Sequence, residues 1–418
     1  MRVIPSILPA SNEAGFELVG RHLSAAKADA FRALGLGIVQ GRRDGVRIWD
    51  LDGKTYINCR SSGGVFDFGH RPRFAIDALA HALEDIGDMG DWLVPSAVRA
   101  QGAAALARFL PGDLTYTFFT PGGGEAVEVA CKLARAVTGR AGIVAAEHGF
   151  NGQVGFALAM DEERNTKWFQ PLVPGVTKVP FGDLDAVDRA VRDETAAVCM
   201  ETIPATAGYV VPTDEYWPGV RAICDERGAL LILDEVQAGL GRTGRVWACN
   251  HWDVVPDLLV TGKGLSGGVY PIAACCFGPR VDAFFTEDPF FHPSSYGGSE
   301  LGAVVVQAVV DKLTEPGFLE HVRVMGERFA AGFDHLRSRF PDVVAGHRGL
   351  GLMRALDTPS ADVCSRVMLE AIEHGVLAIW ANNRQETLLV MPPLVITPDE
   401  VDEVLDGLGH AVAAVAAT

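Results

Sequence analysis

Short apolar runs alternate with helix-like stretches between about residue 73 and residue 310. The strands of a parallel sheet are buried on both faces and therefore read as short continuous apolar runs, whereas the connecting helices keep a single apolar face. This alternation predicts an α/β fold in which a large, mainly parallel sheet carries helices on both of its faces. We expect strands at residues 116–119, 142–146, 196–200, 230–233, 258–260 and 272–277.

Polar or glycine-rich residues follow the first five of these runs. They are the stretch 120–125, the stretch 147–149, Glu201, Asp234 and Lys263. Ligands of open α/β sheets bind outside the carboxyl ends of the strands. We therefore expect these five groups to meet at one edge of the sheet and to form a ligand site there.

The two ends of the chain show a different pattern. A helix is predicted at residues 23–34, and an Asp-Gly turn between apolar segments predicts a hairpin over residues 47–57. After about residue 311 the chain mixes helices with short strands, which indicates a smaller α+β domain. We divide the chain into an N-terminal segment that contributes to the small domain (1–75), a large cofactor-binding domain (76–310) and a C-terminal small domain (311–418).

The charge balance argues against one class of partner. The chain has 36 Lys and Arg against 53 Asp and Glu, a net charge of −17, and it lacks the dense basic cluster that nucleic-acid binding requires. No uninterrupted apolar stretch approaches the roughly 20 residues needed to span a bilayer, and residues 1–20 lack the pattern of a signal peptide. We expect a cytoplasmic protein that acts on small molecules and binds neither nucleic acid nor membranes.

The eight cysteines are scattered and include no Cys-x-x-Cys pair. Several lie in apolar surroundings, as Cys275 and Cys276 do. We expect them to be small core residues in a reducing compartment and not disulfides or zinc ligands, so no metal site is predicted.

Asp234 ends an apolar strand, where an unpaired carboxylate is costly to bury. The protonated nitrogen of a pyridine ring is a suitable partner, and keeping that nitrogen charged is what makes pyridoxal 5′-phosphate an electron sink. Alternatively, Asp234 caps a helix or pairs with Arg242 or Arg245. Gln237 is placed to hydrogen-bond the phenolic oxygen of the same cofactor, unless it is a solvated surface amide.

Lys263 lies between Gly262 and Gly264, which leave space around its amine. Such a lysine can hold pyridoxal phosphate as a Schiff base and then move a proton between the substrate carbon and the cofactor. A surface lysine is the alternative for any isolated lysine. Here the preceding apolar strand and the upstream Asp234 favour the catalytic interpretation.

Two glycine-rich loops are weaker signals by themselves. The loop 120–125 precedes a helix predicted at 126–137, so its backbone amides and the helix N-terminus can bind an anion, although for this loop in isolation an ordinary glycine-rich turn is the favoured interpretation. The loop 292–299 supplies hydroxyl groups, but in isolation it reads as a plain loop.

The chain resembles the class III, fold-type I, pyridoxal-phosphate-dependent aminotransferases, a group that includes ornithine, 4-aminobutyrate and other omega-aminotransferases and glutamate-1-semialdehyde aminomutase. The resemblance extends from residues 50–57 and 68–72 to Pro392-Pro393-Leu394, nearly the whole chain. Its most specific part is the stretch 233–244 followed by Lys263.

The resemblance implies a role for each central residue. Lys263 becomes the Schiff-base lysine, Asp234 the partner of the pyridine nitrogen and Gln237 the partner of the phenolic oxygen. Val236 is implied to pack on one ring face, and Glu201 is a further candidate contact at a strand end.

The resemblance also supports a functional role for the two glycine-rich loops. Gly123 and Gly124 correspond to the loop that holds the phosphate, and Ser295 to a hydroxyl that reaches the phosphate from the neighbouring subunit. The implied assembly is a homodimer with shared active sites. Gly124 stands where the family usually has Ser or Thr, so the phosphate depends more on backbone amides and on Ser295.

Three further departures concern the ring and the substrate. Glu147 stands where the family places an aromatic residue on the ring, unless a shift of one residue brings His148 there. Many relatives carry a Glu near Thr206 and a carboxylate-binding Arg at the position of Leu389. Losing that Arg removes a bidentate contact that neither residue can replace.

We therefore expect an aminotransferase whose amine or carbonyl substrate lacks an ordinary α-amino acid head, unless Arg60 or Arg384 serves as its anchor. A PLP-dependent aminomutase, racemase or decarboxylase is the alternative, with Glu147 as an extra acid or base. A catalytically silent binding protein of the same fold is disfavoured because Lys263, Asp234 and Gln237 are all retained.

Overall fold

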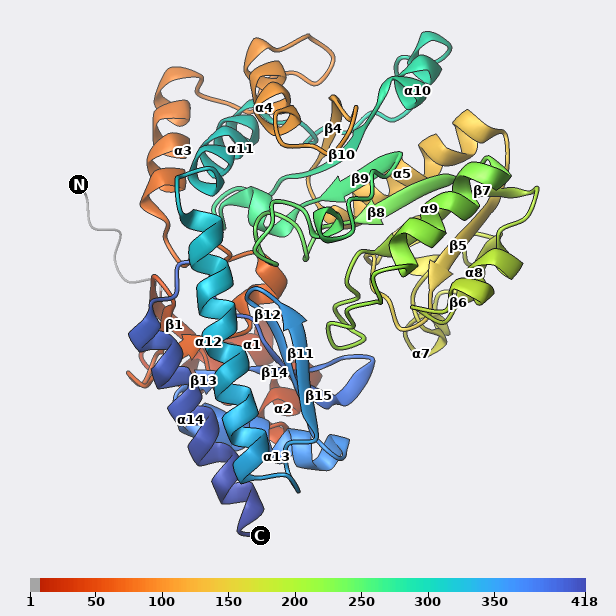
Figure 1. The fold of residues 1–418 in the computed structure, drawn as a ribbon. Coiled ribbons are helices and arrows are strands. Elements are labelled where there is room, and N and C mark those ends of the chain that lie inside the picture. Colours follow the sequence, from red (N-terminus) through yellow and green to blue (C-terminus); the bar gives the residue numbers. More distant parts are fainter. Residues whose placement is uncertain (1–7) are drawn as a thin grey trace.

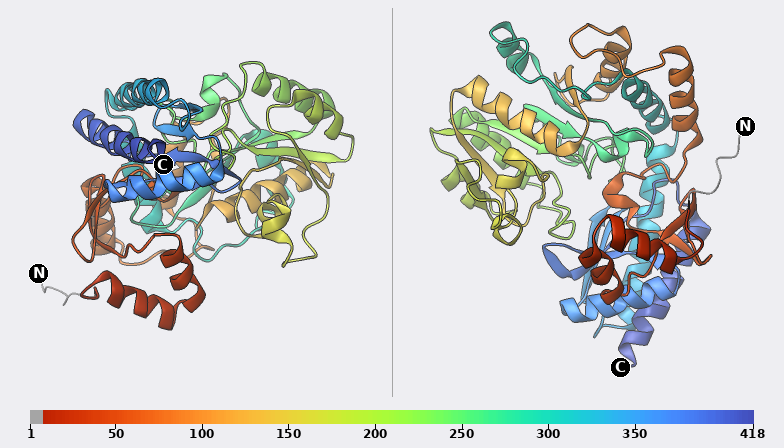
Figure 2. Two further views of the ribbon diagram at one scale, coloured as in Figure 1. Left: turned by 90° about the horizontal axis from the view of Figure 1, so that it is seen from below. Right: turned by 180° about the vertical axis from the view of Figure 1, so that it is seen from behind.

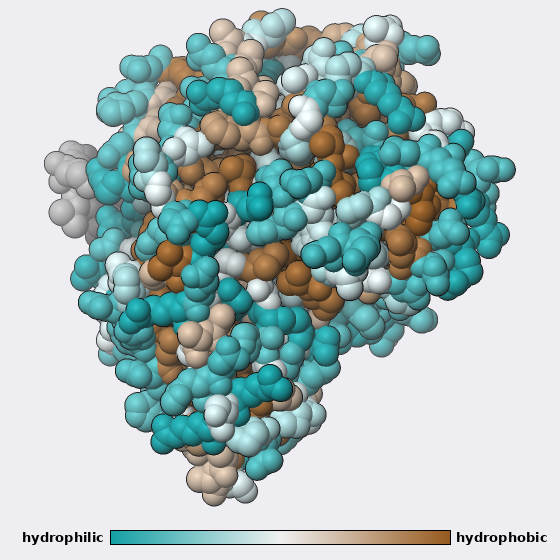
Figure 3. Space-filling view, in the orientation of Figure 1, coloured by the Kyte–Doolittle hydropathy of each residue, from teal (hydrophilic) through white to brown (hydrophobic). Residues whose placement is uncertain are grey.

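A computed structural model describes residues 8–418, in which a seven-stranded sheet and its helices lie beside two four-stranded sheets (Figure 1). The face of the molecule in Figure 3 is mostly hydrophilic, as expected for a chain with a net charge of −17. Within the described residues, no helix is both long and apolar enough to cross a bilayer.

The seven-stranded sheet has the order β4-β10-β9-β8-β7-β5-β6, and β10 runs antiparallel to both of its neighbours. The other paired strands are parallel, which confirms the prediction of a mainly parallel sheet. Six of these strands are expected from the sequence; the edge strand β6 is not, because polar residues interrupt its short apolar pattern. The strands are β4 (Tyr116–Thr120), β5 (Gly142–Ala146), β6 (Val176–Val179), β7 (Thr195–Glu201), β8 (Leu230–Asp234), β9 (Leu258–Thr261) and β10 (Ala273–Phe277).

Helices surround the sheets and fill the space between them. The expected helix at 23–34 is α2, which begins after Ser24, whose side chain accepts a hydrogen bond from the Lys27 amide. The preceding helix, α1, is not among the predicted elements. The α-helices are α1 (Asn12–His22), α2 (Ala25–Ala33), α3 (Arg73–Asp85), α4 (Ala97–Ala107), α5 (Gly123–Thr138), α6 (Gly155–Ala159), α7 (Glu163–Thr166), α8 (Leu184–Ala190), α9 (Tyr216–Arg227), α10 (Pro279–Asp282), α11 (Glu300–Leu313), α12 (Phe318–Arg339), α13 (Ala361–Glu373) and α14 (Pro398–Ala416).

The large sheet is buried on both faces. Successive residues of β8 alternate between two cores: Leu230 and Ile232 pack with α5, whereas Leu231 and Leu233 pack with α9. Because a strand points its side chains to opposite faces in turn, a strand buried on both sides must be apolar at every position. This explains the continuous apolar runs seen in the sequence.

One of the two smaller sheets combines both ends of the chain, and the other is C-terminal. The hairpin expected at 47–57 is present, and β3 is extended in parallel by β13, so the first strands pair with one of the last. Figure 2 shows α1 and α2 lying against the part of the molecule that carries α13 and α14. The residue limits of the predicted domains stay a prediction. One sheet has the order β1 (Gln40–Asp44), β2 (Arg47–Asp50), β3 (Thr55–Asn58) and β13 (Val376–Leu377), and the other has the order β11 (Gly346–Leu350), β12 (Met353–Asp357), β15 (Arg384–Val390) and β14 (Ile379–Ala381).

All eight cysteines are buried and unpaired, which confirms that they are core residues. The chain from residue 8 onward holds no group of three or more His, Cys, Asp or Glu side chains arranged to bind a metal ion.

Candidate active site

The carboxyl ends of three central strands place Glu201, Asp234 and Lys263 beside one another. Glu201 and Asp234 are direct partners in the β7–β8 register, and Asp234 is paired with Val260 of β9, three residues before Lys263. The expected convergence of strand ends therefore holds for these residues. The edge they occupy is a buried one, since Glu201 and Asp234 are only 6% and 4% exposed.

Asp234 is a buried carboxylate held by two neutral donors. Its Oδ2 accepts a hydrogen bond from Asn151 Nδ2 at 2.8 Å, and its Oδ1 accepts one from the Val236 amide at 2.9 Å. Burial raises the pKa of the Asp234 carboxyl, and the two hydrogen bonds oppose that rise. Among residues 8–418 no basic side chain forms an ion pair with Asp234, so the site suits a cationic ligand atom.

Arg242, the alternative partner for Asp234, is used elsewhere. Its guanidinium is fully buried, forms an ion pair with Asp67 and donates to the carbonyl oxygens of Pro392 at 2.6 Å and Leu352 at 2.9 Å. Asp67 in turn lies against Gly264, where an added Cβ would come within 2.8 Å of Asp67 Oδ2. This cluster fixes the turn that carries Lys263.

Lys263 is half-buried and not a free surface lysine. It follows β9 with a φ of 43°, and its Nζ donates to Gln237 Oε1 at 2.7 Å. Burial lowers the pKa of the Lys263 amine, although the carboxylates of Glu201 and Asp234 oppose that change. A lowered pKa increases the fraction of neutral amine, which is the nucleophilic form.

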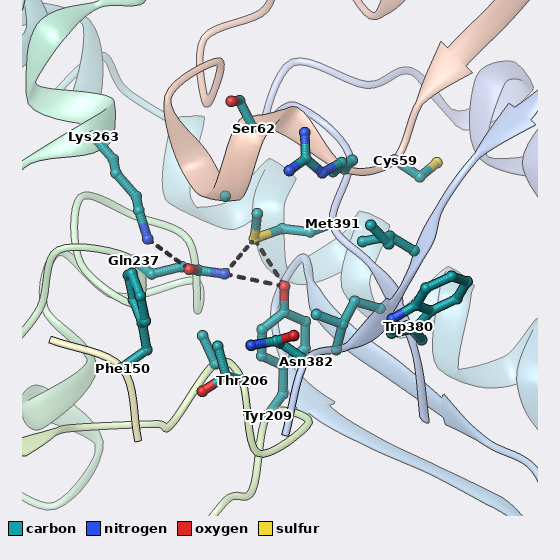
Figure 4. A pocket seen from close by; sticks show the side chains of 15 residues that line it. Cys59, Ser62, Phe150, Thr206, Tyr209, Gln237, Lys263, Trp380, Asn382 and Met391 are labelled. Atoms are coloured by element: carbon teal, nitrogen blue, oxygen red, sulfur yellow. Dashed lines mark hydrogen bonds between the residues drawn. The ribbon is translucent and has the colours of Figure 1, made fainter. Parts of the chain in front are cut away.

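Gln237 lies inside the same cavity and is not a solvated surface amide. Its Nε2 donates to Tyr209 Oη at 3.2 Å, and Tyr209 Oη donates to Met391 Sδ at 3.2 Å (Figure 4). Gly63 lies close to the Lys263 amine, since a Cβ on Gly63 would lie 3.4 Å from Lys263 Nζ. A side chain at position 63 would therefore crowd the reactive amine.

The cavity around Lys263 has a volume of about 330 Å³. That size is at the lower end for small-molecule pockets, so the substrate portion it accepts is small. Its wall is largely apolar, and Figure 4 shows Lys263 and Trp380 on opposite sides of it. The apolar and aromatic lining residues are Phe150, Ala205, Tyr209, Ile379, Trp380, Leu389 and Met391.

Gly123 and Gly124 form the first turn of α5. The residue before that turn, Gly122, provides no side-chain cap, so the first amides of the helix are free to bind an anion. A Cβ on Gly123 would lie 3.1 Å from both methyl carbons of Val236. The predicted phosphate loop and the predicted ring-contact residue are thus neighbours.

Glu147 and His148 are placed elsewhere. They line a second cavity, of about 420 Å³, together with Arg384. Phe150 is the aromatic residue that this loop supplies to the cavity of Lys263. The predicted ring contact of Glu147 or His148 stays a prediction, and this placement does not favour it.

Ser295 lies in the loop before α11, where its neighbour Ser294 donates to Glu125 of α5 at 2.6 Å. The predicted contact of Ser295 is with another subunit and stays a prediction.

Sequence reasoning missed Asn151, Phe150 and Tyr209. Asn151 and Phe150 follow the expected 147–149 stretch, and the Phe150 amide donates to Glu201 Oε1 at 2.8 Å. Their loop position gave no periodic signal. A Phe-Asn pair just after a strand-end glycine was the one available clue.

These residues fit pyridoxal 5′-phosphate by the chemistry of the groups they offer. Asp234 suits a protonated ring nitrogen, the first turn of α5 suits a phosphate, and Lys263 supplies the amine. Val236 and Phe150 are apolar side chains suited to the faces of an aromatic ring.

Comparison with known proteins gives a consistent result. The family model described as "Aminotransferase class-III" matches residues 32–412. The chain is 44% identical over 395 residues to an uncharacterized aminotransferase of Archaeoglobus fulgidus, covering 94% of this chain and 93% of that protein. It is 35% identical over 380 residues to the putrescine aminotransferase of Pectobacterium atrosepticum, covering 88% and 81% respectively.

A solved structure of the ornithine aminotransferase of Toxoplasma gondii superposes with a TM-score of 0.88 at 26% identity, covering 97% of this chain and 95% of that one. That structure is described as showing partial occupancy of PLP at the active site.

The first prediction concerns Glu201. Burial and the neighbouring Asp234 raise the pKa of Glu201 to about 8 from 4.5. The native state therefore holds this proton more tightly than the unfolded state, and its stabilising effect is lost as the pH rises from about 5 to about 8. In urea unfolding of the cofactor-free protein, we expect Glu201→Gln to flatten this decline in the free energy of unfolding.

The matched control is Glu84→Gln, which removes an exposed carboxylate from α3. A Glu201→Gln protein that loses stability with pH as steeply as the wild type contradicts the assignment.

The second prediction concerns the buried ion pair. Asp67→Ala leaves the Arg242 guanidinium buried without an anion, so we expect the free energy of unfolding to fall by on the order of 3–5 kcal/mol. Asp77→Ala breaks the exposed ion pair with Arg73, which should lower the free energy of unfolding by less than about 1 kcal/mol. Equal losses of unfolding free energy in the two variants would show that the buried Asp67–Arg242 pair contributes no more to stability than an exposed ion pair.

Proposed function

The chain belongs to the class III aminotransferases, which depend on pyridoxal 5′-phosphate, and we propose that its amino donor is a primary amine without a carboxylate on the reacting carbon. The amino group passes from this donor to the carbonyl carbon of a ketone or aldehyde. The observation that carries the proposal is the apolar wall beside Lys263.

Leu389 of β15 and Met391, just after that strand, line the cavity on one side, and Thr206 lines it from the segment after β7. None of the three side chains can neutralise a carboxylate. Within the described residues, the basic side chains that line this cavity are Lys263 itself and Arg60. An α-carboxylate facing Leu389 would lose its hydration without gaining a partner, which is costly.

The comparisons support this choice of donor. Putrescine, which gives one relative its name, is a diamine without a carboxylate. Ornithine aminotransferase, another similar protein, carries the name of a substrate with an amine at the end of its chain.

The bound cofactor supplies an aldehyde carbon that reacts with amines and a ring that takes up electrons from the substrate carbon. The chain's own residues hold and orient it: Asp234 at the ring nitrogen, Gly123 and Gly124 at the phosphate, and Gln237 at the phenolic oxygen. Val236 limits the movement of the ring on one face.

Lys263 moves the proton in this proposal. With the cofactor bound, Lys263 would hold it through Nζ, and the same amine would serve as base and acid at the substrate carbon. Its lowered pKa lets the neutral amine accept a proton there and return it as the ammonium ion. The apolar wall excludes water that would compete for this proton.

The remaining parts of the proposal concern assembly and location. We place the site at the interface of a homodimer, where Ser295 of one subunit reaches the phosphate bound by the other. A cytoplasmic location is supported by eight buried cysteines, all unpaired. A mutase, racemase or decarboxylase reaction has no comparable support, because Glu147, its suggested extra acid or base, lines the second cavity.

The third prediction tests the donor with a matched pair. Butan-1-amine and norvaline differ only by the α-carboxylate, and we expect the amine to react at least about tenfold faster, as the desolvation cost of an unpaired carboxylate implies. The measurement is the change in cofactor absorbance of the holoenzyme after each donor is added singly. A faster reaction with norvaline contradicts the proposed donor class.

Lys263→Ala is the control for this assay, because it should abolish the absorbance change with both donors while the protein stays folded. An absence of change in the wild type with every primary amine tested would remove the proposed function itself.

A further inference from the structure

Arg60 is the second basic residue that lines the cavity of Lys263, and its side chain is exposed. Within residues 8–418 its guanidinium takes part in no ion pair and no hydrogen bond, whereas Arg384, the other possible anchor, pairs with Glu386 at 3.3 Å. Arg384 also lines the second cavity and not that of Lys263. The Arg60 guanidinium therefore has its five N–H donors available for a ligand of this cavity.

The turn that carries Arg60 is fixed relative to Lys263. Residues 61–64 all have positive φ angles, including 46° at Ser61 and 51° at Ser62. Left-handed backbone at residues other than glycine persists only where the surroundings enforce it, and such turns concentrate at functional sites. Here the amides of Arg60 and Ser61 donate to Asn58 Oδ1 at 3.2 and 3.0 Å, and Gly63 abuts Lys263.

Arg60 also marks the limit of the cavity. Arg60 and Ile379 line both this cavity and a neighbouring apolar one next to α1 and α2, whereas Lys263 lines only the first. Arg60 thus stands where the two cavities adjoin, and Lys263 does not. The rest of the cavity wall is largely apolar and includes Trp380 and Leu389.

From this arrangement we propose that Arg60 binds a carboxylate at the far end of an aliphatic substrate whose amine or carbonyl carbon lies at Lys263. The inference rests on the proposed function and deepens it, because it separates the carboxylate from the reacting carbon by an apolar chain. A guanidinium binds a carboxylate through two parallel hydrogen bonds, which a lysine cannot reproduce. Arg60 is accordingly a specificity-determining residue for ω-amino acids and ω-oxo acids.

The fourth prediction is tested first by binding, without turnover. Pentanoate and pentan-1-ol are matched in chain length but differ in charge, and their affinity for the holoenzyme is measured by ligand-observed NMR. We expect Arg60→Gln to weaken the binding of pentanoate by about tenfold or more, since a hydrogen bond to a charged group is lost. The affinity for pentan-1-ol should not change. Arg60→Lys should be intermediate, and Arg384→Gln should match the wild type.

Three results would overturn the assignment: no detectable binding of pentanoate to the wild type, equal binding by Arg60→Gln, or a loss confined to Arg384→Gln. Because the measurement needs no reaction, it remains decisive even if the proposed donor class fails.

Kinetic comparison then identifies which substrate carries the carboxylate. The donor pair is 5-aminopentanoate and pentan-1-amine, and the acceptor pair is 5-oxopentanoate and pentanal. In Arg60→Gln we expect KM to rise by about tenfold or more for the carboxylated member of at least one pair, while the uncharged member and kcat change little. An equal rise for charged and uncharged members would mean a structural role and would refute the anchor.

Discussion

The buried guanidinium of Arg242 is the interaction on which the site depends. It joins Asp67 of the N-terminal segment to the carbonyl groups of Leu352 and Pro392 in the C-terminal part, while its own backbone belongs to the segment after β8. Taking such a charge out of water is expensive; Asp67 and the two carbonyl oxygens compensate at the terminal nitrogens, whereas Nε has no hydrogen-bond partner within the described residues. The three segments that meet at Arg242 all contribute to the wall around Lys263, so one desolvated group helps to set their relative positions.

Around that fixed point the ionisable groups influence one another. The Lys263 amine has a lowered pKa and the carboxyls of Asp234 and Glu201 have raised ones, in each case chiefly because of burial. Burial therefore shifts all three groups toward their neutral forms in the protein alone. A cationic ring nitrogen beside Asp234 would reverse this preference for that carboxyl, so cofactor binding and the charge of the site are linked.

The sequence predicted the structure best for strands that are buried on both faces, where every position has the same requirement for an apolar side chain. Strands such as β8 are buried on both faces and have to be apolar throughout, so the polar residues at the strand ends, Asp234 and Lys263, stand out in the sequence alone. The edge strand β6 and the two- and three-residue strands β13 and β14 lie under weaker constraints and leave no readable pattern. Phe150, Asn151 and Tyr209 come from loops whose paths are set by contacts with distant residues, such as the amide of Phe150 with Glu201. Such long-range contacts cannot be predicted from the residues near each loop in the sequence.

The parallel pairing of β3 with β13 has a consequence for biosynthesis. Ile57 lies opposite Val376, so the neighbour of this strand is made about 319 residues after it (376 − 57). Until then the edge of β3 is an open template for other chains, during a period when the large sheet between them can already fold. The charged first strand, whose Arg42, Arg43 and Asp44 are all exposed, is the kind of sequence that discourages such pairing on the opposite edge. Completion of the smaller lobe, and with it the wall that faces Lys263, therefore has to wait until residue 376 has been made.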